Sequence, residues 1–259
     1  MYKEFETKTS YKYLQEVIKH LNEPICILGG WAVFFHVNKK YQEAKNTPYL
    51  GSRDIDLGFH LKEKMTPSEL AQSSLGQTIH ILRDKLHFKP LSFRFLKEIH
   101  TETEEELSDS RHVPSPFIFL MYVDLIVDAI PPDFKKTLNF SPIDEPLLSF
   151  AFTNEEYRRS VTEFHRKLLL PAPELLIAMK MTSLPQRDKV HKKIKDICDL
   201  FSLLWYSDIK KEILEDFVLL SKTKIQECQN SITKEEFEKA GQQLGHTAVE
   251  IRRVIELVK

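Results

Sequence analysis

The chain has 259 residues, of which 42% are hydrophobic and 29% are charged, and its formal net charge at pH 7 is −1. This composition is typical of a soluble globular protein with one large or two small domains, and it excludes a chain that is disordered throughout. With a net charge so close to zero, the chain has no overall positive field to hold long nucleic acid. Any contact with RNA would therefore need a local basic patch.

The cysteines and the amino terminus indicate a cytoplasmic protein. Cys26, Cys198 and Cys228 lie far apart and form no CxxC pair, which favours reduced thiols over a disulfide framework or a zinc site. The first six residues contain no apolar signal region, and no run reaches the roughly 18 apolar residues of a membrane span. We therefore expect a cytoplasmic location and no membrane partner.

The amino-terminal part of the chain is predicted to mix helices and strands. The elements expected there are a helix over 11–21, a strand over 24–28, a helix from 31 to about 42, a strand over 53–59, a helix from 66 to about 87 and a strand over 88–99. The start at Thr66 is marked by a capping box with Glu69 and by Pro67 at the first helical position.

Two features of this region suggest a functional site. Gly29-Gly30 separates the strand over 24–28 from the helix that follows, and a glycine-led helix start can bind phosphate through free backbone N–H groups. The strand over 53–59 alternates polar and apolar residues, so that Asp54 and Asp56 share one face about 7 Å apart, where two carboxylates can hold a divalent ion. Each feature alone could be an ordinary turn or a solvated strand edge. Together they favour a phosphate site beside a metal site.

The most apolar run, 117–130, lies between prolines and is predicted to be a central strand. Its only charged residues, Asp124 and Asp128, lie four positions apart and so share one face. A buried carboxylate needs a cation or hydrogen-bond donors, which makes either residue a candidate third metal ligand. Asp128 lies near the strand end, where a loop N–H group or solvent could satisfy it.

The remaining segments divide the chain into two regions. The acidic stretch 101–111 is expected to be a solvated hairpin tip, and 147–152 and 161–170 are expected to be short strands. Helical periodicity then recurs over 174–183, 194–206, 209–220, 234–244 and 247–258. We therefore predict an α/β (α+β) fold, with a mixed-sheet domain at 1–170, a helical bundle domain at 171–259, and a ligand site in the cleft between them.

This pattern resembles the nucleotidyltransferase superfamily with the DNA polymerase β catalytic fold. The signature of that superfamily is a glycine pair after a strand, an Asp-x-Asp on the next strand and a third acidic residue on a later strand. These are matched here by Gly29-Gly30, by Asp54-Ile55-Asp56 and by Asp124.

Within the superfamily, the chain is most similar to the AbiEii-type toxin nucleotidyltransferases. Those proteins carry a Pro-x-Pro-Glu helix that reaches a lysine, as in 171–180 (PAPELLIAMK), and later a Lys-Asp-x-x-Asp-Leu motif, as in 195–200 (KDICDL). The matches extend from Ile27 to Leu204, about two thirds of the chain.

The resemblance implies magnesium-dependent transfer of a nucleoside monophosphate from an NTP, such as ATP, to an acceptor hydroxyl. Asp54, Asp56 and Asp124 would be the catalytic residues and the ligands of two Mg²⁺ ions, and Asp124 would also take the proton of the attacking hydroxyl. The nucleotide-binding residues would be Gly29, Gly30, Arg53, Lys180 and Asp196. A toxin-like member would act on a macromolecule, such as a tRNA end or a protein, and could have a cognate antitoxin as its partner.

Several alternatives stay open at this point. The acceptor could be a small molecule of the antibiotic type, or the chain could be a non-catalytic member that binds nucleotide. Lys180 could be an exposed helix lysine, and Asp196 could pair with Lys180 or serve the start of its own helix. The basic run 187–195 could bind a phosphate-bearing acceptor or be a solvated helix start.

Overall fold

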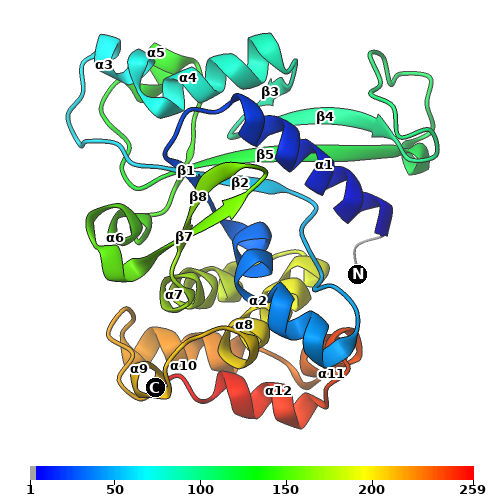
Figure 1. The fold of residues 1–259 in the computed structure, drawn as a ribbon, viewed down its shortest axis with the longest axis vertical. Helices are drawn as coiled ribbons and strands as arrows, with labels where there is room; N and C mark the ends of the chain where they lie inside the picture. The colour runs from blue at the N-terminus through cyan, green and yellow to red at the C-terminus, as the bar shows by residue number, and fades with distance from the viewer. Residues whose placement is uncertain (1–3) are drawn as a thin grey trace. The chain divides into compact units, whose positions relative to one another are not determined.

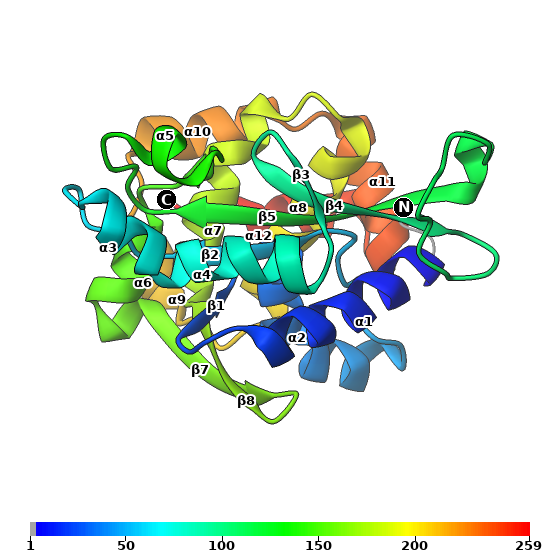
Figure 2. The ribbon, with the colours of Figure 1, turned by 90° about the horizontal axis from the view of Figure 1, so that it is seen from above.

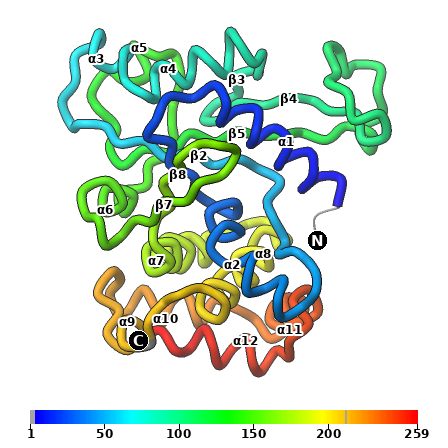
Figure 3. Tube along the Cα trace, in the orientation of Figure 1, coloured from blue at the N-terminus to red at the C-terminus, as the bar shows by residue number. Residues whose placement is uncertain are grey.

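A computed structural model describes residues 4–259; Met1 to Lys3, part of the amino-terminal stretch without a signal region, lie outside the described residues. The chain forms two compact units (Figures 1 and 3). The sheet unit contains the described residues up to Trp31 and Leu50–Pro171, and the helical unit contains Ala32–Tyr49 and Ala172–Lys259. The chain therefore enters the helical unit twice. The sequence-based domain ranges, divided after residue 170, stay a prediction.

The sheet unit is built on an eight-stranded mixed sheet, in the order β3-β4-β5-β2-β1-β8-β7, with β6 also paired to β5. Its strands are β1 (Ile25–Ile27), β2 (Ile55–Phe59), β3 (Lys89–Leu91), β4 (Arg94–His100), β5 (Ile118–Val127), β6 (Ile143–Asp144), β7 (Arg158–Glu163) and β8 (Arg166–Pro171). The long strand β5, seen along its length in Figure 2, pairs with β2 in parallel and with β4 in antiparallel orientation. This confirms the α/β fold class and the predicted central strand.

Helix α1 (Glu4–His20) covers one face of the sheet. It buries Leu14, Val17 and Ile18 completely, and its Phe5 ring lies 5.7 Å from the ring of Phe119 in β5. Strand residues of alternate parity point to opposite faces, so Phe119 and its like-facing neighbours form the core under α1. The predicted helix is confirmed, and it begins earlier than expected, at Glu4.

The helix expected from Thr66 to about His87 starts as predicted but is broken into pieces. Thr66 and Glu69 form the capping box of α3 (Pro67–Gln72). Ser73 then adopts an extended conformation, and its Oγ accepts a hydrogen bond from Gly76 N at 3.1 Å. This side chain caps a new helix, because Ser competes with helical hydrogen bonding through its own hydroxyl. The continuation is α4 (Ser74–His80) and a π-helical turn (Ile81–Lys85).

Three strand predictions in this unit are wrong in detail. The segment 88–99 is a hairpin, β3 and β4, with Ser92 at φ +56° in its turn. The segment 147–152 is helix α6 (Leu148–Thr153), in which Leu148 and Ala151 are buried with helical rather than strand spacing. The segment 161–170 is the β7–β8 hairpin, whose turn residues Phe164 and His165 both have positive φ. Such turns usually carry Asn or Gly. This turn has neither residue, so the sequence contains no signal for it. Helix α5 (Phe134–Leu138) completes the unit.

The helical unit contains most of helix α2 (Gly29–Lys45), whose first three residues belong to the sheet unit. Its other helices are α7 (Pro173–Ser183), α8 (Val190–Tyr206), α9 (Lys211–Glu215), α10 (Lys222–Ser231), α11 (Lys234–Leu244) and α12 (Ala248–Ile255). Helix α8 supplies the core of the unit with the fully buried Ile197, Cys198 and Phe201. The helix predicted over 209–220 is only the short α9. Among the helices in residues 4–259, none combines the length and apolar character needed to cross a membrane.

Candidate functional site

Three charged residues form a row across neighbouring strands of the sheet unit. Asp56 in β2 lies directly opposite Asp124 in β5, and Asp124 lies directly opposite Arg94 in β4. Residues opposite each other on paired strands point to the same face. The row therefore lies on the sheet face away from α1, because Asp124 has the opposite parity to Phe119.

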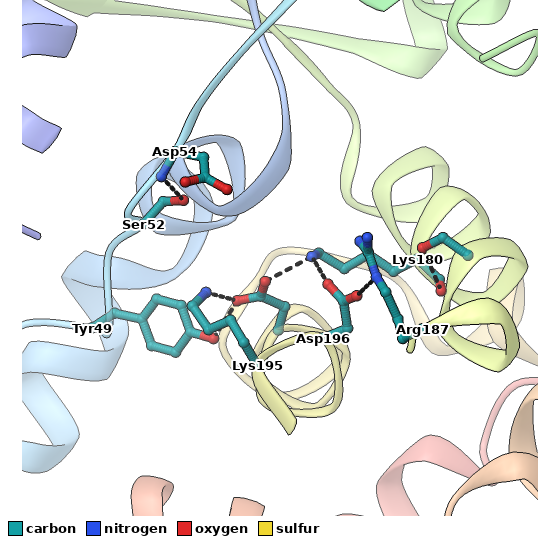
Figure 4. A network of polar contacts seen from close by, with 9 residues as sticks. Tyr49, Ser52, Asp54, Lys180, Arg187, Lys195 and Asp196 are labelled. Atoms are coloured by element: carbon teal, nitrogen blue, oxygen red, sulfur yellow. Dashed lines mark hydrogen bonds and ion pairs between the residues drawn. The ribbon is translucent and has the colours of Figure 1, made fainter. Parts of the chain in front are cut away.

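Asp54 lies beside this row but not in the strand. Strand β2 begins at Ile55, so the prediction of a strand over all of 53–59 is too long by two residues. The Asp54 backbone N–H donates to Ser52 Oγ at 3.4 Å (Figure 4). Its carboxylate is still close enough to raise the pKa of Asp124, so the two predicted metal carboxylates of this segment lie near the third.

Asp124 is a strongly perturbed carboxyl group. Only 4% of the residue is exposed, and burial followed by the negative charge of Asp56 raises its pKa to about 7, against the lowering effect of Arg94. Its Oδ2 accepts a hydrogen bond from Arg94 Nη2 at 2.7 Å. Its Oδ1 is buried and has no hydrogen-bond partner in the described part of the chain. A buried, unpartnered carboxylate oxygen is rare enough to require an explanation.

The glycine turn lies directly against Asp56. Gly29 has φ +57°, and a Cβ atom added to it would lie 1.9 Å from Asp56 Oδ2. Leu28 N also donates to the Asp56 backbone oxygen at 2.9 Å. The start of α2 therefore lies directly beside the carboxylates of the sheet unit. The bulky Trp31 does not disturb this turn, since its ring is buried and its Nε1 donates to Ser10 Oγ at 3.0 Å.

Asp128 and Arg53 take other roles. Asp128 is satisfied locally, because its Oδ1 accepts from Leu61 N at 2.9 Å and its Oδ2 lies 2.5 Å from His60 Nδ1. Arg53 lies 3.4 Å from Glu6 in α1, and its guanidinium carbon is 5.2 Å from the centre of the Phe119 ring. The contact with Phe119 lies on the α1 side of the sheet, whereas Asp56 and Asp124 face the other side. The role of Arg53 in nucleotide binding stays a prediction.

Lys180 and Asp196 belong to a buried charged network in the helical unit, shown in Figure 4. Lys180 Nζ lies 2.7 Å from Asp196 Oδ1 and 2.7 Å from Asp199 Oδ2. Arg187 Nε donates to Asp196 Oδ2 at 2.6 Å, and Lys195 pairs with Asp199. We call these five residues the lysine–aspartate network. Lys180 is only 8% exposed, so the alternative of an exposed helix lysine is wrong, and Asp196 does pair with it.

Each charged group of this network lies against a group of opposite charge. Burial alone would lower the pKa of Lys180, but the charges of Asp196 and Asp199 outweigh it and raise that pKa. Burial would likewise raise the pKa of Asp196, but Lys180 and Arg187 keep it lowered. Lys180 and Asp196 are therefore both ionised at neutral pH.

The basic run 187–195 is not a free surface patch. Arg187 and Lys195 belong to the network, and Lys193 Nζ lies 2.6 Å from Ser231 O and 3.1 Å from Glu236 Oε2. Three cations of the run are thus committed to contacts within the helical unit. The expectation that the whole run could serve a phosphate-bearing acceptor is therefore too broad.

Sequence reasoning missed Arg94 and gave no role to Asp199. Asp199 is part of the KDICDL motif, and its carboxylate accepts a hydrogen bond from the Tyr49 hydroxyl at 2.6 Å. The motif itself was the available signal. Arg94 gave none, because its contact with Asp124 depends on the register between β4 and β5.

In residues 4–259, no group of three or more His, Cys, Asp or Glu side chains is gathered closely enough to hold a metal ion. Magnesium, however, is usually bound by one or two carboxylates together with substrate phosphates rather than by a complete protein cage. Asp124 supplies such a carboxylate, because its Oδ1 has no hydrogen-bond partner among the described residues. Asp54 and Asp56 lie close enough to raise the pKa of Asp124 and so supply negative charge at the same place. The donor set therefore suits a magnesium ion that arrives with substrate phosphates.

Comparisons with known proteins add little. No protein-family model matches the chain, and no curated protein matches it. Among solved structures, a similar chain is found in the crystal structure of an antigenic nucleotidyltransferase-like protein from Paracoccidioides brasiliensis, with 16% sequence identity and a TM-score of 0.39. The match covers 94% of this chain and 93% of that chain. A likeness of this degree decides neither the activity nor the site.

Proposed function

We propose that this protein is a magnesium-dependent nucleotidyltransferase that moves a nucleoside monophosphate from an NTP to an acceptor hydroxyl on an RNA or a protein. The observation that carries the proposal is the state of Asp124. Its carboxylate is buried opposite Asp56, one of its oxygens has no hydrogen-bond partner within residues 4–259, and its pKa is raised by burial and by the neighbouring negative charges. A cation bound to these carboxylates would remove both the repulsion and the unsatisfied oxygen.

Each residue of the sheet unit has a role in this proposal. Gly29 and Gly30 begin α2, and the N–H groups of this helix start would bind the triphosphate. Asp54, Asp56 and Asp124 would hold magnesium, with Oδ1 of Asp124 as the free ligand atom. Magnesium bound there would neutralise the triphosphate and make the α-phosphorus more electrophilic. Asp124 would also accept the proton of the attacking hydroxyl.

The lysine–aspartate network would bind an anionic group of the nucleotide. The partial exposure of Arg187 supports this role. Lys180 and Arg187 would make the contacts, and Asp196, which lies between them, would orient both cations instead of touching the nucleotide. Arg53, with its contacts to α1 and Phe119, has no part in this proposal.

The test is incorporation of label from each of the four NTPs, with and without Mg²⁺, into total RNA, lysate protein and aminoglycosides. Asp56→Asn and Asp124→Asn should abolish label transfer while the far-UV circular dichroism stays that of the wild type. Asp128→Asn is the matched control, since Asp128 is also buried but is satisfied by Leu61 and His60. Full activity of Asp56→Asn would overturn the assignment. Labelling of aminoglycosides alone would move the acceptor to small molecules.

A non-catalytic nucleotide-binding protein is the second candidate. Two observations favour it: Arg94 already occupies one oxygen of Asp124, and the described residues contain no preassembled three-carboxylate group. Calorimetric titration with each NTP distinguishes the two functions. Tight NTP binding without Mg²⁺-dependent transfer to any acceptor would support the second candidate.

A further inference from the structure

We propose that Arg94 is a positioning residue that holds Asp124 with one carboxylate oxygen turned to the metal and the acceptor. The inference rests on the proposed function, in which Asp124 is a magnesium ligand. Its first support is the register of the sheet, which places Arg94 directly opposite Asp124 on the strand next to β5, on the side away from Asp56.

The contact between the two side chains is one-sided. A fully paired arginine and carboxylate form two parallel hydrogen bonds. Here only Nη2 donates, to Oδ2 at 2.7 Å. Arg94 Nε and Asp124 Oδ1 are both buried, and neither has a hydrogen-bond partner among the described residues. A purely structural ion pair would be expected to close this second bond, because each buried unpaired group costs about 1–3 kcal/mol. The open geometry therefore points to a third component of the site.

Two aromatic rings hold the guanidinium in its orientation. Its central carbon lies 4.7 Å from the centre of the Phe93 ring and 4.3 Å from the centre of the Tyr122 ring. Both distances lie within the range of a cation–π interaction. A planar guanidinium packed on rings presents its donors in a fixed direction, which the rotating ammonium group of a lysine does not do. Arg94 can therefore fix the plane of the Asp124 carboxylate as well as its charge.

Charge and position have opposite effects on metal binding, which makes the inference testable. Arg94 is a cation next to Asp124, so by charge alone its removal should make Mg²⁺ bind more tightly. If Arg94 positions the carboxylate, its removal should instead weaken Mg²⁺ binding, because Asp124 could then turn away from the metal. The sign of the change decides between the two effects, and it is measured with the metal alone.

The experiment compares the full-length wild type with Arg94→Ala, Arg94→Lys and Arg83→Ala. Arg83 is the matched control, because it pairs only with the exposed Asp84 among the contacts resolved for it. Calorimetric titration with Mg²⁺ should give about tenfold weaker binding for both Arg94 variants and unchanged binding for Arg83→Ala. In the labelling assay, kcat of Arg94→Ala should fall about 10²-fold, the size of effect expected when a reacting group is misplaced by about 1 Å. The KM for NTP should stay the same.

Added guanidinium at a non-denaturing concentration gives a further readout. It should restore part of the kcat of Arg94→Ala, and a structural defect would not respond in this way. Tighter Mg²⁺ binding by Arg94→Ala, or a loss of kcat that guanidinium does not reverse, would overturn the inference. If the wild type transfers no nucleotide at all, the proposed function fails, and the sign of the Mg²⁺ titration still decides the role of Arg94.

Discussion

Asp124→Asn should make the metal-free protein more stable at alkaline pH. The folded protein raises the pKa of this carboxyl from 3.8 to about 7. Between these values the folded state holds a proton that the unfolded state has lost, so stability falls as pH rises from about 4 to about 7 and is constant above that. The raised pKa of Asp124 lowers the free energy of unfolding by about 4 kcal/mol at pH 8 and by about 2 kcal/mol at pH 5. Asparagine cannot ionise, so the variant does not lose this stability as the pH rises.

The advantage of Asp124→Asn over the wild type should therefore grow by about 2–3 kcal/mol between pH 5 and pH 8. Using this difference cancels any pH-independent effect of the asparagine itself. Urea unfolding with a metal chelator measures it, with tryptophan fluorescence as the signal. The chain has two tryptophans, and Trp31 is buried in the sheet unit while Trp205 belongs to the helical unit. A Trp205→Phe background therefore makes the fluorescence report on the sheet unit alone.

Saturating Mg²⁺ should reverse this advantage. The wild type should gain stability from the ion, since a ligand that binds only the folded state stabilises it, and Asp124→Asn should gain much less. An advantage that is the same at pH 5 and pH 8 would refute the account of Asp124 as a carboxylate strained by its neighbours. Equal stabilisation of both proteins by Mg²⁺ would refute its role as a ligand.

Four further substitutions test other parts of the structure. Gly29→Ala should abolish nucleotide transfer, because the new Cβ would lie 1.9 Å from Asp56 Oδ2, whereas Gly245→Ala, also at positive φ but facing only a flexible lysine, should lose about 1 kcal/mol of stability and keep its activity. Lys180→Ala should lower the stability of the helical unit by about 3–5 kcal/mol in urea unfolding followed by circular dichroism, because it removes the buried cation that Asp196 and Asp199 share. It should also weaken NTP binding in calorimetry. His165→Gly should raise the unfolding free energy by about 1 kcal/mol, since only glycine adopts φ +59° without strain; an unchanged urea midpoint would contradict this.

Local signals in the sequence predicted the parts of the fold that local interactions determine. The capping box at Thr66, the glycine turn at Gly29 and the central strand near Asp124 are each set by residues within a few positions of one another. The hairpin turn at Phe164 and His165 could not be predicted in this way. Its residues are unusual at positive φ, so the conformation must be imposed by the pairing of β7 with β8.

The candidate site could be predicted only in part for the same reason. The sequence spacing of Asp54 and Asp56 suggested that they act together, and the sheet register places Asp124 opposite Asp56. The contact of Arg94 with Asp124 depends on pairing between strands that are far from any shared motif. The burial of Lys180 depends on the packing of helix α7 against α8. Charge patterns alone contain no information on either contact.

The division of helix α2 between the two units has a consequence for synthesis of the chain. Val33 and Val37 are fully buried, and the Tyr41 ring lies 5.1 Å from Tyr206 in the same unit. Residues 32–49 leave the ribosome well before residues 172–259, which complete that unit. At ordinary translation rates the delay is on the order of ten seconds. During this time the apolar side of the helix lacks its partners, so we expect nascent chains to bind chaperones through it.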